Sequence, residues 1–151
     1  MRIFFLLALT TLFLAFACNK KASDVASSPT ESKPAVTKMM KFGENGVLQP
    51  GESIGVEQSD VTFAFVRMLS ESRCPTGVSC IQAGEATALV AVNDDEPQKI
   101  TIGAERGGVR VPIEGGAVVI TSLNPYPVAR VKTPRSEMKL GFRLVAAKTM
   151  K

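Results

Sequence analysis

The 151-residue sequence predicts an all-β domain behind an N-terminal processing signal. From about residue 43 to residue 148, apolar and polar residues alternate with a period of two, which is the period of a strand. Clusters of Gly, Pro, Asn and Asp separate the alternating stretches at the spacing of short strands. No stretch after residue 20 keeps helical periodicity for three turns. We therefore expect an antiparallel β-sandwich, or a partly open barrel, of about seven to eight short strands with one disulfide.

The first three expected strands lie between residues 52 and 92. Glu52–Gln58 alternates weakly and follows the turn residues Pro50 and Gly51. In the stretch Val61–Leu69 one face carries Val61, Phe63, Phe65 and Leu69, with Arg67 as an interruption. Glu85–Val92 becomes apolar on both faces, as expected of a strand in the centre of a sheet.

Four further strands are expected in the C-terminal part of the domain. Gln98–Gly103 alternates through two isoleucines, and Val109–Ile113 is a weaker candidate. Ala117–Leu123 is rich in β-branched residues, which favour strands. Met138–Ala146 has the cleanest alternation of the chain and is expected to be the final strand.

The first 17 residues predict a lipoprotein signal peptide. Arg2 precedes the apolar run Ile3–Ala17, which is shorter than the roughly 20 residues of a membrane-spanning helix. Leu14–Cys18 resembles a bacterial lipobox, although Ala15 stands where the box usually has Leu. We expect cleavage before Cys18 and lipidation of Cys18; the alternative is a plain secretory signal that ends next to a cysteine.

Residues 18–42 predict the lipidated cysteine and a disordered tether. Small, polar and charged residues dominate this segment, together with Pro29 and Pro34, and such a composition buries too little apolar surface to fold. Asn19 follows Cys18, which by analogy with enterobacterial sorting favours the outer membrane. We expect a cell-envelope protein, lipid-anchored in the outer membrane, with the all-β domain at residues 43–148.

Cys74 and Cys80 are expected to form the disulfide. Outside the cytoplasm two neighbouring thiols are oxidised to each other, and Pro75 and Gly77 favour a tight reversal between them. The chain-entropy gain for so small a loop is about 2.4 kcal/mol. A redox-active pair is the alternative, but such sites typically have two intervening residues at a helix N-terminus, and here five intervene.

The sequence around this pair resembles a motif of an uncharacterised family of small secreted bacterial proteins and lipoproteins. The motif reads roughly D-S-R-C-P-x-x-V-x-C-x-W-A-G-x-A, and residues 71–86 match it with Glu71 in place of Asp and Gln82 in place of Trp. A later stretch, residues 123–127, resembles the family's L-x-P-Y-P turn. The resemblance implies a β fold and an envelope location, and no activity.

Glu71, Arg73 and Glu85 flank the cysteine loop and form the candidate binding loop, because loops on a rigid scaffold commonly carry binding. The structural alternative is that Arg73 pairs with a carboxylate and bonds carbonyls to fix the turn. No residue set predicts a metal or cofactor site. Nucleic acid is not an expected partner, because few aromatic side chains accompany the basic ones.

These features predict an envelope lipoprotein that presents a binding or structural domain on a tether, with the membrane and an envelope protein as partners. One alternative is a protease inhibitor that uses the loop Arg73–Ser79. A less favoured one is a hydrolase that uses carboxylates alone, with six candidates: Glu44, Glu52, Glu57, Glu85, Glu105 and Glu114. The chain has no His, which excludes Ser-His-Asp and Cys-His mechanisms, and we do not expect an enzyme.

Overall fold

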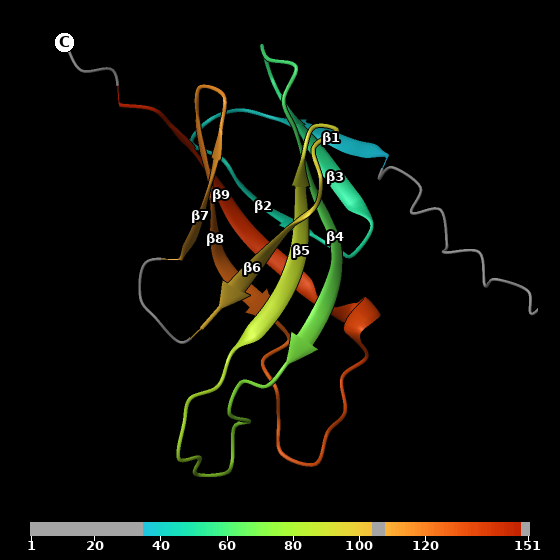
Figure 1. Ribbon diagram of the computed structural model, residues 1–151, viewed down its shortest axis with the longest axis vertical. Coiled ribbons are helices and arrows are strands. Elements are labelled where there is room, and N and C mark those ends of the chain that lie inside the picture. Colours follow the sequence, from blue (N-terminus) through green and yellow to red (C-terminus); the bar gives the residue numbers. More distant parts are fainter. Residues whose placement is uncertain (1–34, 104–107, 149–151) are drawn as a thin grey trace, which may run out of the picture. The chain divides into compact units, whose positions relative to one another are not determined.

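The computed structural model describes residues 35–103 and 108–148, which form an all-β fold (Figure 1). Its elements are β1 (Val36–Met40), β2 (Asn45–Leu48), β3 (Glu52–Val56), β4 (Thr62–Glu71), β5 (Ala86–Val92), β6 (Gln98–Ile102), β7 (Val109–Ile113), β8 (Gly116–Asn124), the short 3-10 helix η1 (Arg135–Glu137) and β9 (Lys139–Ala146). All seven expected strands are present, so the predicted fold class is confirmed. In the ranges described, no helix is long and apolar enough to cross a membrane. The predicted signal peptide, Cys18 and Glu105 lie outside these ranges.

The strands form two sheets. One has five strands in the order β1-β3-β4-β5-β6, and the other has four in the order β2-β9-β8-β7 (Figure 1). Neighbouring strands are antiparallel, except that β1 runs parallel to β3. This two-sheet arrangement is the expected sandwich.

The hydrophobic core collects the apolar residues that alternate along the strands of both sheets. Phe63 and Phe65 of β4 are fully buried, and so is Phe142 of β9. The rings of Phe63 and Phe142 lie with their centroids 5.9 Å apart, which joins the two sheets through one aromatic contact. The period-two pattern therefore identifies the buried face of β4 correctly as far as Phe65. Beyond it the prediction for Leu69 is wrong, because the register shifts after Phe65 and Met68 enters the core instead.

The folded domain begins at Val36 rather than at residue 43, because β1 lies inside the segment expected to be tether. Met40 is only 1% exposed and belongs to the core, and the side chain of Met39 fills the space above Gly55 on the neighbouring strand β3. Burial of Met40 and pairing with β3 offset the conformational entropy that a short polar strand loses when it becomes ordered. The sequence pattern does not predict the strand β2 either. Its Leu48 is a second buried side chain, after Met40, in this N-terminal part of the domain.

Each sheet has two edge strands, and none of them is a long regular strand. β1 carries a register shift between Val36 and Lys38, and β2 has only four residues. β6 exposes Lys99, and β7 contains Pro112, which has no N–H for a sheet ladder.

Two long connections leave the sandwich at the same end (Figure 1). Residues 72–85 connect β4 to β5, and residues 125–138 connect β8 to β9. We call these two segments together the loop end.

Candidate functional site

The Cys74–Cys80 disulfide predicted from the sequence is formed, with a Cα–Cα distance of 6.0 Å. The base of its loop extends the pairing of β4 with β5: the N–H of Ser72 donates to the carbonyl oxygen of Glu85 at 2.9 Å, and the N–H of Cys74 donates to that of Ala83 at 2.7 Å. Gly84 has a φ of +67°, and a Cβ there would collide with the carbonyl oxygen of Ser72. The disulfide loop is therefore held from its base as well as across the bridge.

Arg73 connects the two sheets at the loop end. Its side chain is 6% exposed, and its guanidinium binds the Glu71 carboxylate through two parallel contacts, Nε–Oε1 at 2.9 Å and Nη2–Oε2 at 2.5 Å. Nη1 donates to the carbonyl oxygen of Leu123 at 2.8 Å, and Nη2 donates to that of Pro125 at 3.4 Å. The guanidinium carbon lies 4.8 Å from the centre of the Tyr126 ring, within cation–π range. Arg73 thus ties the end of β4 to the end of β8.

A second link joins the two loops nearer their tips. The N–H of Thr76 donates to the carbonyl oxygen of Pro127 at 2.9 Å, and the N–H of Ala129 donates to that of Thr76 at 3.1 Å. These two bonds form a parallel bridge between Thr76 and Val128. Because the disulfide, Arg73 and this bridge act together, the two loops are held side by side.

An open groove of about 920 Å³ lies between the two loops. Its apolar lining includes Pro75, Pro127 and Val131, and its charged lining includes Lys132 and Arg135. Among the described residues that line it, the only acid is the Glu71 that binds Arg73.

Large exposed apolar side chains gather at the loop end. Five of the eight in the described part of the chain are here, whereas the other three lie on β1 and β2, so the accumulation belongs to this end. They are Val78 (52% exposed), Ile81 (104%), Tyr126 (43%), Val128 (48%) and Val131 (61%). Exposed apolar clusters of this kind mark surfaces that contact a protein or a membrane.

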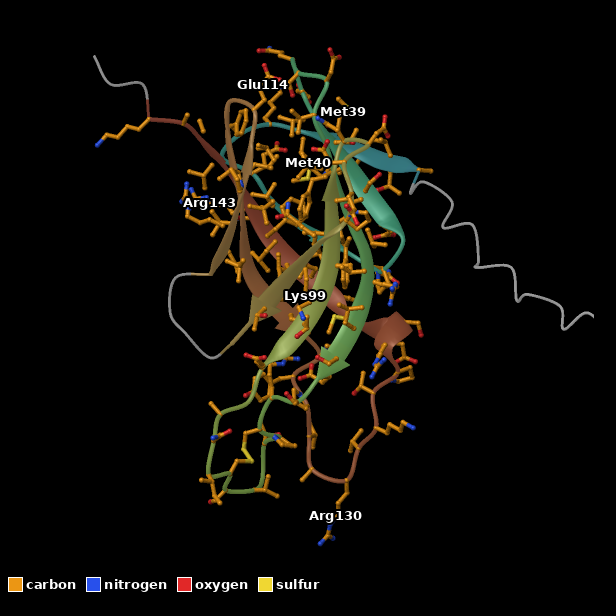
Figure 2. All side chains as sticks on the ribbon, viewed as in Figure 1. Met39, Met40, Lys99, Glu114, Arg130 and Arg143 are labelled. Carbon is orange, nitrogen blue, oxygen red and sulfur yellow. A yellow bond between two sulfur atoms is a disulfide. The ribbon has the colours of Figure 1, made fainter. Side chains whose placement is uncertain are left out.

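The loop end is also basic. Its segments, residues 72–85 and 125–138, contain four basic residues and two acidic ones, Glu85 and Glu137. Arg73 is bound to Glu71, which leaves Arg130, Lys132 and Arg135 as exposed cations. Arg130 points outward from the tip of its loop (Figure 2). Both acids lie where the loops meet the strands: Glu85 directly precedes β5, and Glu137 lies two residues before β9.

Of the three residues of the candidate binding loop, the structure brings together Glu71 and Arg73. The side chain of Glu85 is exposed, and its backbone carbonyl oxygen accepts bonds from the N–H and the hydroxyl of Ser72. Gln82, where the resembling family has Trp, is exposed on the same loop.

The sequence patterns around Cys74 and Cys80 do not identify residues 125–138 as part of the site. A signal was available: three prolines and three basic residues occur before its first acid, in a connection too long for a simple turn. The sequence does not show that Arg73 donates a hydrogen bond to the carbonyl oxygen of Leu123, which lies 50 positions later and just before this segment.

Four of the residues that the inhibitory and hydrolytic alternatives need have other contacts. Arg73 is buried, so it does not present a side chain to a protease pocket. Glu44 and Glu52 accept the backbone N–H groups of Lys41 and Gln49, and Glu57 lies 3.7 Å from the Lys41 ammonium. No group of three His, Cys, Asp or Glu suited to a metal ion occurs within residues 35–103 and 108–148.

Comparison of the chain with protein-family models, with curated proteins and with solved structures finds no match.

Proposed function

We propose that this chain is a bacterial envelope lipoprotein, anchored through Cys18, whose β-sandwich is a binding domain that makes its contacts with the loop end. The observation that carries the proposal is the coincidence of exposed apolar and basic side chains on two braced loops. A surface held in one conformation loses little entropy when it binds, so bracing by the disulfide and Arg73 favours a contact surface.

The envelope location is supported by the disulfide and by the N-terminal sequence. Disulfides persist in oxidising compartments outside the cytoplasm. The apolar run Ile3–Ala17 ends directly at Cys18, and Cys18 precedes the first strand residue, Val36, by 18 positions. Fully extended, such a connection reaches about 60 Å, which keeps the domain close to the anchoring membrane.

The proposal is tested by fractionating cells that produce the full chain or its Cys18→Ser variant after growth with labelled palmitate. We expect label and membrane association for the unsubstituted chain and no label for the variant. Labelled protein should crosslink to its envelope contact, and loss of that crosslink on substitution of loop-end residues would support the binding role. If the unsubstituted chain carries no label and is soluble, the anchoring is refuted. If substitutions in the loop end leave the crosslink unchanged, the loop end is refuted as the binding surface.

A further inference from the structure

Several apolar side chains of the loop end are exposed. Ile81, directly after Cys80 in the connection between β4 and β5, is fully exposed, and Val131 is 61% exposed in the neighbouring loop. Tyr126, 43% exposed, adds a ring with an apolar body and a polar tip, which suits a boundary between water and an apolar phase. These side chains are displayed by loops that the Thr76–Val128 bridge holds together.

Exposed cations accompany these apolar tips. Arg130, Lys132 and Arg135 occur within six consecutive residues that contain no acid, and Val131 lies between the first two. Long basic side chains can keep their charge in the headgroup layer while their stems and the neighbouring aliphatic residues enter the apolar layer. An acidic protein would satisfy the cations, but it would not require aliphatic side chains that project from loop tips.

From this combination we infer that the loop end binds the anionic phospholipid surface of the membrane, an inference that rests on the proposed function and names its binding partner. The aliphatic tips enter the interface, and the three cations contact lipid phosphates around them. The groove beside Lys132 and Arg135 leaves space for a headgroup between the loops.

The affinity required for this contact is small. A short connection to a lipid anchor makes docking intramolecular, with an effective concentration in the millimolar range. A domain that binds free vesicles only weakly is therefore docked for much of the time when it is anchored.

The test uses the mature chain, residues 18–151, with Cys18→Ser and the disulfide oxidised, so that no acyl chain contributes. Co-sedimentation is measured with vesicles of phosphatidylethanolamine and phosphatidylglycerol, and with vesicles of phosphatidylcholine alone. We expect binding to the anionic vesicles that weakens at high salt, and little binding to the zwitterionic ones. Equal binding to both, or no binding to anionic vesicles at low salt, would overturn the inference whatever the variants do.

The position of the contact is tested with two triple variants that remove the same charge. The first replaces the loop-end cations (Arg130→Gln, Lys132→Gln, Arg135→Gln), and the second replaces exposed cations on the outer faces of the sheets (Lys99→Gln, Arg110→Gln, Arg143→Gln). We expect about 100-fold weaker binding for the first, because each basic residue near an anionic surface contributes about a factor of five. Equal losses in both would mean that net charge alone attracts the chain, and the loop end would not be the site.

The apolar contribution is tested with Val131→Ser and Val47→Ser, at positions that are 61% and 62% exposed. We expect about fivefold weaker vesicle binding for Val131→Ser and no change for Val47→Ser. An unchanged Val131→Ser variant would contradict insertion.

Two outcomes separate this inference from the proposed function. If the unlipidated chain fails to bind vesicles but crosslinks through Arg130, Lys132 and Arg135 to an acidic protein, the lipid assignment is wrong while the anchored binding protein stands. If vesicle binding is found but Cys18 carries no lipid, the anchoring is wrong while the lipid contact stands.

Discussion

Replacement of Arg73 by Ala should destabilise the domain more than any exposed charge substitution. The Arg73 side chain is buried between the ends of β4 and β8. Its removal breaks the two-point ion pair with Glu71 and leaves the carbonyl oxygen of Leu123 without this donor.

The size of the effect follows from these contacts. Removing one partner of a buried ion pair costs about 3–5 kcal/mol, but the Glu71 side chain is 24% exposed and regains some hydration in the variant. Loss of a hydrogen bond at the Leu123 carbonyl adds about 1 kcal/mol. We therefore expect the free energy of unfolding to fall by about 3 kcal/mol.

The measurement is urea unfolding followed by circular dichroism, which suits a chain without Trp. Arg110→Ala, on the exposed side of β7, is the matched control and should change the free energy by less than about 0.5 kcal/mol. Arg73→Lys keeps the charge but lacks the planar fork, so we expect it to recover only a minority of the loss. A fall below about 1 kcal/mol for Arg73→Ala would refute the assignment of Arg73 as the link between the sheets.

Three further substitutions test other parts of the fold. Met40→Ala should lower the free energy of unfolding by about 3 kcal/mol if β1 belongs to the core, whereas the half-exposed Met39 should tolerate Ala far better; equal small losses in urea unfolding would place β1 outside the cooperative unit. The double variant Cys74→Ser, Cys80→Ser should lose about 2 kcal/mol and melt several degrees earlier by calorimetry, and an unchanged melting temperature would mean that the bridge contributes nothing. Gly84→Ala should be markedly more destabilising than Gly77→Ala, because both have positive φ but only the Cβ at residue 84 meets a backbone oxygen; equal thermal shifts would contradict this clash.

Local patterns in the sequence predict much of the fold. The alternation in the first half of β4 and in β9 arises because one side of each strand faces the core, and that requirement appears directly in the order of residues. The Cys74–Cys80 bridge is predicted equally well, since its partners lie in one short segment and no other pairing among the residues after Cys18 is available.

The missed elements depend on contacts between distant segments. β1 occurs in a polar stretch and gains its stability from parallel pairing with β3 and from burial of Met40, neither of which leaves a local period in the sequence. In the same way, the composition around Arg73 predicts a charged cluster, but the carbonyl groups that complete it come from Leu123 of β8 and from Pro125, just after β8. Which end of the sandwich carries the exposed apolar side chains follows only from the topology.

The four edge strands bear on how readily two copies of the domain can join through their sheets. Open sheet edges invite intermolecular β-pairing and aggregation. The register shift in β1 and Pro112 in β7 interrupt the row of backbone groups that a second copy would need, β2 offers only a short row, and Lys99 places a charge on β6. The domain can therefore reach a high local concentration without its sheets joining into fibrils.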